Sequence, residues 1–143
     1  MLLVREFYKV ETVYIPQAVY REVAITDLLS DLLTLSWIKV ESPKSSQVQT
    51  LLNASDFNRL GGGEQEAITL ALENEYSVLL MNDNQARRLA IAQGITVVNI
   101  PAFLLACKMA GLLDKSAIGQ LVADLQTKDH YGFRQDVLEL LIS

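Results

Sequence analysis

Three consecutive glycines, Gly61 to Gly63, stand directly before a segment with the spacing of an amphipathic helix. A glycine run weakens regular structure, so the helix is predicted to begin at Glu64 and to run over residues 64–75. An apolar run over residues 78–81 then ends close to Asp83. Such a run is typical of a strand that is covered on both faces. Acidic residues thus stand at a helix start and beyond a strand end, where they can converge at one edge of a sheet.

Three other short runs have the composition of strands, at residues 12–15, 37–40 and 96–100. Helical patterns separate the four runs. Alternation of this kind predicts an α/β fold with a mostly parallel sheet and helices on both of its faces.

Several helix ends are readable from the residues. Pro16 suits the first turn of a helix that holds Val19 and Val23, and Thr26 or Asp27 is predicted to cap a second helix over leucines 28–33. Asn84 is predicted to cap a helix over residues 85–93 that ends at Gly94. Further helices are expected over residues 102–110, from Asp114 or Ser116, and over residues 133–142.

The 143 residues are enough for one domain with a buried core, and no apolar run reaches the length of a membrane span. Cys107 is the only cysteine and lies in an apolar helical stretch, so we expect a buried, inert thiol and a reducing, cytoplasmic location. The net charge is −5, and Arg87-Arg88 is the densest basic pair. Tight binding of nucleic acid by clustered cations alone is therefore not indicated.

The acidic residues have two interpretations that the sequence leaves open. Asp83 lies just past a strand, where ligands gather in open parallel sheets, but it equally suits a helix cap. Glu64 and Glu66 stand roughly 200° apart on a helical wheel, so only one of them can face a cleft, and both also suit the dipole of a first turn. Glu22 follows the first strand and its helix. Taken together, these carboxylates are the ligand type that a hard divalent cation prefers.

The sequence lacks the residues that other kinds of catalytic or binding site require. His130 is the only histidine, which leaves neither a zinc site nor a Ser-His-Asp arrangement. The glycine run lacks the lysine and hydroxyl residue of a phosphate loop. Arg87 and Arg88 follow Asp83 by one helical turn. Three roles are open for them: contact of one of them with a phosphate, surface charge, or an ion pair with a site carboxylate.

Four segments resemble the PIN-domain family, and in particular a bacterial and archaeal subgroup of PIN-like proteins. The first two are Val13-Tyr14-Ile15-Pro16 with Val19-Tyr20-Arg21-Glu22, and Gly63-Glu64-Gln65-Glu66-Ala67-Ile68. The third is Asp83-Asn84-Gln85-Ala86-Arg87, and the fourth is the C-terminal region that includes the stretches around Cys107 and Tyr131. In this order and spacing, the segments span nearly the whole chain.

This resemblance implies a three-layer α/β/α sandwich and a metal-dependent ribonuclease that uses Mg²⁺ or Mn²⁺. Carried over by position, Glu22, Glu64 and Asp83 are the expected catalytic residues, and Glu66 is a fourth expected metal ligand. The substrate would be RNA, and many relatives are toxins held inactive by a small antitoxin protein.

The chain departs from the family pattern at its beginning. It is expected to form a single PIN-like domain over residues 1–143 without the usual first strand and its aspartate. Either that strand lies upstream of Met1, or a homodimer partner fills its place. Loss of that ligand is expected to impair nuclease activity. The alternatives are a non-catalytic PIN-fold module that binds nucleic acid or protein, and a scaffold whose acids only start helices.

Overall fold

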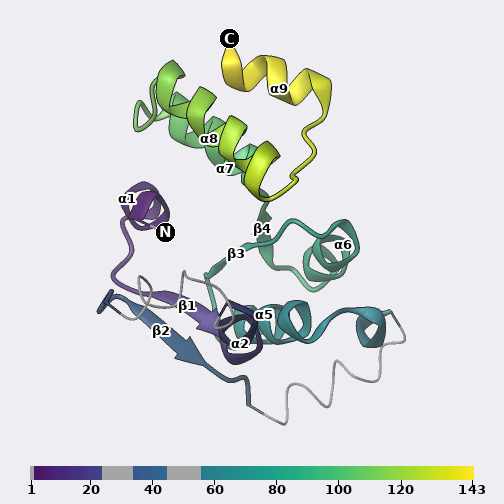
Figure 1. The fold of residues 1–143 in the computed structure, drawn as a ribbon. Helices are drawn as coiled ribbons and strands as arrows, with labels where there is room; N and C mark the ends of the chain where they lie inside the picture. Colours follow the sequence, from purple (N-terminus) through teal and green to yellow (C-terminus); the bar gives the residue numbers. More distant parts are fainter. Residues whose placement is uncertain (1, 24–33, 45–55) are drawn as a thin grey trace. The chain divides into compact units, whose positions relative to one another are not determined.

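The computed structural model describes residues 2–23, 34–44 and 56–143 (Figure 1). The chain divides into two compact units. The strand unit comprises Val10–Val98, and the helical unit comprises Met1–Lys9 with Asn99–Ser143. The helix predicted over leucines 28–33 lies outside the described residues.

Four strands lie in the strand unit. β1 (Val13–Pro16) pairs in parallel with β2 (Ile38–Glu41), with Val13 opposite Ile38. β3 (Val78–Leu80) pairs in parallel with β4 (Thr96–Val98), with Leu79 opposite Val97. All four predicted strands are therefore confirmed to within two residues at each end. Within the described ranges they form two parallel pairs rather than one continuous sheet.

The helices of the strand unit follow the predicted order. They are α2 (Gln17–Val23), the 3₁₀ turn η1 (Phe57–Arg59), α5 (Gly62–Glu73) and α6 (Asn84–Ala92). α6 connects β3 to β4, which makes the parallel crossover that such a pair requires. The turn η1 was not predicted from the sequence.

Local residue chemistry explains where α6 begins and ends. The N-cap residue is Asp83, whose carboxylate accepts a hydrogen bond from the Ala86 N–H. The prediction that Asn84 would be the cap was wrong by one residue, because aspartate and asparagine cap equally well and the sequence holds both in succession. Gly94 has a φ of +81°, the left-handed conformation that ends a helix and favours glycine, as predicted.

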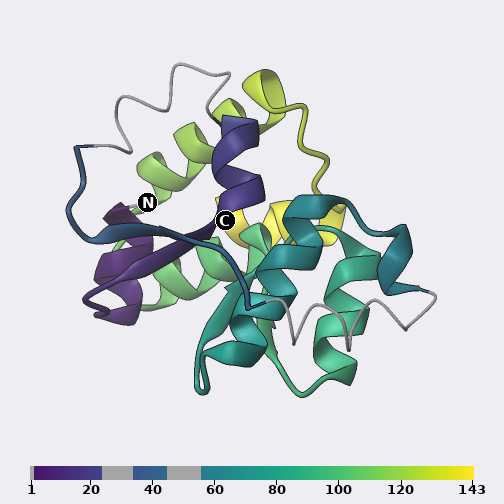
Figure 2. The same ribbon diagram turned by 90° about the horizontal axis from the view of Figure 1, so that it is seen from below.

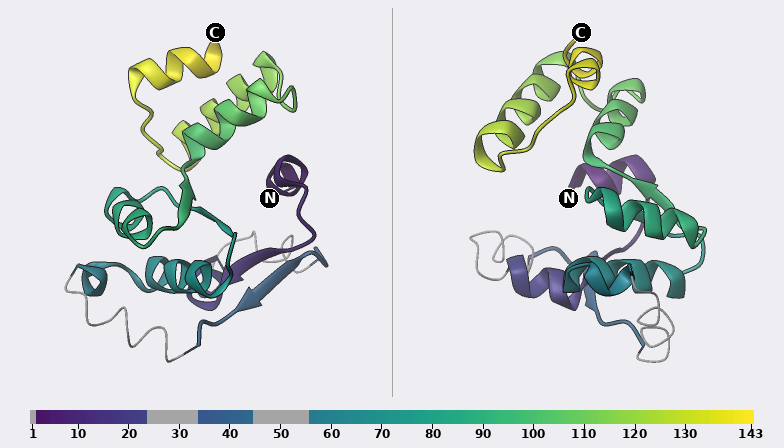
Figure 3. Two further views of the ribbon diagram at one scale, coloured as in Figure 1. Left: turned by 180° about the vertical axis from the view of Figure 1, so that it is seen from behind. Right: turned by 90° about the vertical axis from the view of Figure 1, so that its right-hand side faces the viewer.

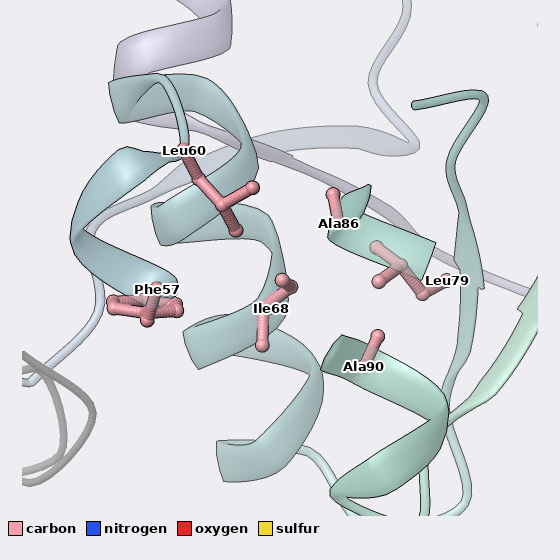
Figure 4. Packing of buried hydrophobic residues seen from close by; sticks show 6 residues of the cluster. All are labelled: Phe57, Leu60, Ile68, Leu79, Ala86 and Ala90. Atoms are coloured by element: carbon pink, nitrogen blue, oxygen red, sulfur yellow. The ribbon is translucent and has the colours of Figure 1, made fainter. Parts of the chain in front are cut away.

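The core of the strand unit lies between α5, α6 and β3. Ile68 of α5 faces Ala86 and Ala90 of α6 and Leu79 of β3, and Phe57 and Leu60 close the cluster (Figure 4). Small alanines on α6 permit this close packing. The expectation that the third strand is covered on both faces was wrong within this unit, because Val78 and Leu80 are exposed and only Leu79 is buried.

The helical unit contains α1 (Leu2–Tyr8), α7 (Ile100–Met109), α8 (Lys115–Lys128) and α9 (Gln135–Ile142). Helices α7, α8 and α9 pack against one another (Figure 2, Figure 3). Their shared core consists of four buried residues: Leu104, Ile118, Val122 and Leu141.

Two predictions for the helical unit are confirmed. Asp114 caps α8 by accepting a hydrogen bond from the Ala117 N–H at 2.7 Å. Cys107 is buried and unpaired.

The Tyr8 ring stacks on Phe103 with 6.1 Å between centroids, which packs α1 against α7. In the part of the chain that the structure describes, every helix is too short or too polar to cross a membrane.

Candidate functional site

Helices α2 and α5 approach each other closely because α5 begins with glycines. A Cβ atom on Gly62 would lie 3.9 Å from the Ala18 Cβ, which is an ordinary contact. A Cβ atom on Gly63 would lie 3.1 Å from both Glu22 Oε1 and Val19 Cγ2, which is tighter than side chains normally pack. The prediction that the helix begins at Glu64 was wrong by two residues, because Gly62 and Gly63 form the first two positions of α5. Gly63 leaves the space that the Glu22 carboxylate occupies.

Glu66 ties the same two helices together by a hydrogen bond. The Ala18 N–H donates to Glu66 Oε2 at 2.7 Å. Ala18 is the second residue of α2, where backbone N–H groups have no partner inside the helix. The Glu66 carboxylate thus caps α2 from a neighbouring helix, and its negative charge suits the helix dipole there.

Helical spacing places the Glu22 and Glu66 side chains on the surfaces that face each other. On α2, Ala18 and Glu22 are four residues apart, and on α5, Gly63 and Glu66 are three apart, so each pair shares one face of its helix. Ala18 contacts Glu66, and Glu22 lies against Gly63. Glu22 and Glu66 therefore line one helix contact; we call them the α2–α5 carboxylate pair.

Glu64 points elsewhere on α5. It is the third helical residue after the N-cap Gly61, the position from which a glutamate side chain folds back toward its cap residue. Its carboxylate lies directly against Gly61. This arrangement gives Glu64 a role at the helix start, and its predicted catalytic role stays a prediction.

Asp83 stands at the beginning of α6, beyond the carboxyl end of β3. Its Oδ1 accepts the Ala86 N–H at 2.8 Å, and the residue is exposed. Helix α6 packs against α5. The capping role is thus visible in the structure, while the predicted catalytic role of Asp83 stays a prediction.

Gln65 is a residue that sequence reasoning missed. Its side-chain Nε2 donates to the backbone carbonyls of Phe57 at 3.2 Å and Leu60 at 3.0 Å. These bonds hold η1 against the first turn of α5 and so fix where the glycine run enters the helix. A glutamine between two glutamates gives no sequence signal for this role, because its partners are backbone atoms of a turn that was not predicted.

Among the described residues, no group of three or more His, Cys, Asp or Glu side chains is arranged to hold a metal ion. A Mg²⁺ site, however, commonly uses only one or two carboxylates and retains several waters. Glu22 and Glu66 place carboxylate oxygens of that ligand type at the contact between α2 and α5, where the Ala18 N–H donates to one oxygen of Glu66.

Comparison with known proteins gives one match. A family model described as a PIN domain matches residues 3–143, which is nearly the whole chain. No curated protein and no solved structure matches the chain.

Proposed function

The chain belongs to the PIN-domain family, a nuclease-type α/β fold, and from that membership we propose that it is a metal-dependent ribonuclease whose α2–α5 carboxylate pair holds Mg²⁺ or Mn²⁺. The observation that carries the proposal is that Glu22 and Glu66 both lie at the contact between α2 and α5. PIN domains generally use divalent metals, and paired carboxylate oxygens are the ligands that hard cations prefer.

The residues of this chain contribute binding and orientation. The Ala18 N–H holds Glu66 Oε2 in place and leaves Oε1 for a cation. Glu22 is positioned by the missing Cβ at Gly63. Asp83 keeps a second carboxylate oxygen beyond the one that caps α6, so it is available to a substrate-bound water. A bound cation would polarise the phosphodiester and lower the pKa of an attacking water.

A metal-dependent site also suits the charge of the chain. With a net charge of −5, the protein repels a polyanion, and a divalent cation supplies the local positive charge that RNA phosphates need. We further propose that the protein is cytoplasmic, that it forms a homodimer, and that a small antitoxin protein controls it by covering the site. The single, buried cysteine fits a reducing compartment.

The test is cleavage of a fluorescently labelled single-stranded RNA with Mn²⁺ and with EDTA. Glu22→Gln and Glu66→Gln should each lower the rate by at least about a hundredfold, because each removes a metal ligand. Asp83→Asn should also lower it while keeping the α6 cap, since asparagine caps as well as aspartate. Asp114→Asn is the matched control, because Asp114 caps α8 in the same way outside the site. Cleavage that persists in EDTA, or that survives both glutamate substitutions, contradicts the proposal.

A second candidate function is a non-catalytic PIN-fold module that binds nucleic acid or protein. It is favoured by the observation that the described residues contain no three-carboxylate group. RNA binding that needs no metal and is unaffected by Glu22→Gln and Glu66→Gln would support this candidate over the ribonuclease.

A further inference from the structure

Arg87 carries a buried donor without an acceptor. Among the described residues, its Nε atom is shielded from solvent and has no hydrogen-bond partner. Its Nη1 lies 3.5 Å from the Asn84 Oδ1, at the outer limit for a hydrogen bond. Arg87 is the fourth residue of α6, one turn after the N-cap Asp83.

An unpaired guanidinium N–H of this kind is costly, since arginine does not lose its proton in proteins. Within the described part of the chain, Arg87 forms no ion pair with Asp83 or with another acid. The reading of Arg87 as a partner of a site carboxylate is therefore not supported. A donor held in this state is suited to an acceptor that a ligand brings.

The surroundings of Arg87 favour an anionic acceptor. The first turn of α6 carries unpaired backbone N–H groups and the positive end of the helix dipole, and Asp83 caps only the Ala86 N–H. Arg88 follows directly but lies about 100° away from Arg87 around the helix and is exposed. Arg87 and these N–H groups therefore favour an anion at the start of α6 in a chain whose net charge is −5.

We propose that Arg87 binds a non-bridging phosphate oxygen of the RNA backbone and so positions the strand for the carboxylate residues. The proposal rests on the proposed ribonuclease function and names a substrate contact of the same site. Arginine suits this task because its planar fork offers two donors, Nε and one Nη, to two oxygens of one phosphate. A single strand of RNA presents such a phosphate at every nucleotide, so a strand bound at the α2–α5 carboxylate pair has further phosphates to offer to neighbouring elements.

The experiment measures binding apart from cleavage. Fluorescence anisotropy of a labelled ten-nucleotide oligouridylate is recorded with Ca²⁺, another cation that oxygen ligands bind, in place of Mn²⁺, and gel electrophoresis checks that the RNA stays intact. The whole chain is compared with four variants: Arg87→Gln, Arg87→Lys, Arg88→Gln and Arg88→Lys. Arg87→Gln should raise the Kd about tenfold, as expected for loss of charge-assisted hydrogen bonds. Arg87→Lys should also raise it several-fold, because lysine keeps the charge but lacks the fork. The Arg88 variants, matched in charge, should stay within about twofold of the unaltered chain.

Three results would overturn the proposal: equal weakening by the Arg87 and Arg88 substitutions, no binding of the oligouridylate by the unaltered chain, or equally effective competition by polyglutamate, which would identify a carboxylate partner. Thermal unfolding of each variant, monitored by circular dichroism, establishes that it is folded. Removing an unpaired buried donor should not lower the melting temperature. If only the ribonuclease proposal fails, the result is different: RNA binding still depends on Arg87, but no Mn²⁺-dependent cleavage is seen.

Discussion

At the scale of single residues, the site depends on the absence of a Cβ atom at Gly63. Gly63 is buried, and its lack of a Cβ lets the Glu22 carboxylate and the Val19 side chain lie against the start of α5. Gly62, its neighbour in the same helix turn, has only an ordinary contact with Ala18 at the corresponding position. The two glycines therefore differ in function although the sequence presents them as equivalent.

This difference predicts unequal effects of the same substitution at the two positions. Gly62→Ala should stabilise the protein by up to about 1 kcal/mol, because it restricts the unfolded chain without a clash. Gly63→Ala should be about 1 kcal/mol less stable than Gly62→Ala, since the new methyl group overpacks the helix contact. Urea unfolding measures both values.

The movable neighbour of Gly63 is the Glu22 carboxylate, so Gly63→Ala should also weaken Mn²⁺ binding in a calorimetric titration, while Gly62→Ala should not. Equal behaviour of the two variants in both measurements would contradict the role given to Gly63.

Cys107 and Tyr8 predict how stability responds to alkaline pH. Burial raises the pKa of the Cys107 thiol above its ordinary value of 9.0. Burial, and secondarily the nearby Cys107, raises the pKa of the Tyr8 hydroxyl above 10.0. The folded state thus holds these protons more tightly than the unfolded state. Their contribution to stability is complete below about pH 9 and is lost as the pH rises through the raised folded values.

The free energy of unfolding should accordingly fall between pH 9 and pH 11, as measured by urea unfolding at several pH values. Cys107→Ala should flatten the first part of that decline. A decline of the same steepness in Cys107→Ala would assign the effect to other groups.

At the scale of elements, α9 is held at its carboxyl end by a lysine of another helix. Lys108 of α7 donates from Nζ to the backbone carbonyls of Leu140 at 2.8 Å and Leu141 at 3.1 Å. As carbonyls of the last turn they have no backbone N–H partner inside α9, although the hydroxyl of the C-cap residue Ser143 also donates to Leu140 at 3.2 Å. A cation suits that end of the helix dipole. The contact joins the ends of two helices that are distant in sequence.

Lys108→Met should therefore destabilise the protein by about 1 kcal/mol, since it leaves the two carbonyls without this donor. Lys115→Met is the control, because Lys115 lies exposed at the first position of α8. Hydrogen exchange should show faster opening of α9 in Lys108→Met alone. Unchanged exchange in α9 would show that the lysine is not needed to hold it.

The elements were largely predictable because their ends carry strong local signals. Gly94 and Asp114 act through backbone geometry or a side-chain hydrogen bond, and each lies at a helix boundary as predicted. Pro16 was predicted in the first turn of the following helix but is the last residue of β1. Register and pairing were not predictable to the same degree. Strand pairing depends on which strands meet in the folded chain, which has no local sequence signal. The turn η1 depends on the hydrogen bonds of the Gln65 side chain, which have no local sequence signal either.

The candidate site was predictable in residue type but not in geometry. The spacing of Glu64 and Glu66 showed that only one could face a cleft, but the face that packs against α2 is decided by tertiary contacts. The structure puts Glu66 on that face and folds Glu64 back over Gly61. The structure thus places Glu66 at the contact with α2 and Glu64 at the helix start, and the expected ligand role of each stays a prediction.

At the scale of the whole molecule, the proposed site and the alkaline response belong to different units. Glu22, Glu64, Glu66 and Asp83 all lie in the strand unit, whereas Cys107, Tyr8 and Lys108 lie in the helical unit. Family membership spans both units, and the single domain expected from the sequence stays a prediction. Metal binding should therefore protect the strand unit first, by linkage between binding and folding.

The most direct test of the central claim is an NMR titration of the ¹⁵N-labelled protein with substoichiometric Mn²⁺, which broadens the signals of amides close to the bound ion. The account predicts selective broadening around Glu22, Gly63 and Glu66, which is lost in Glu66→Gln. Broadening centred on other acids such as Asp124 and Asp129, or the same pattern in Glu66→Gln, would contradict a cation held by the α2–α5 carboxylate pair.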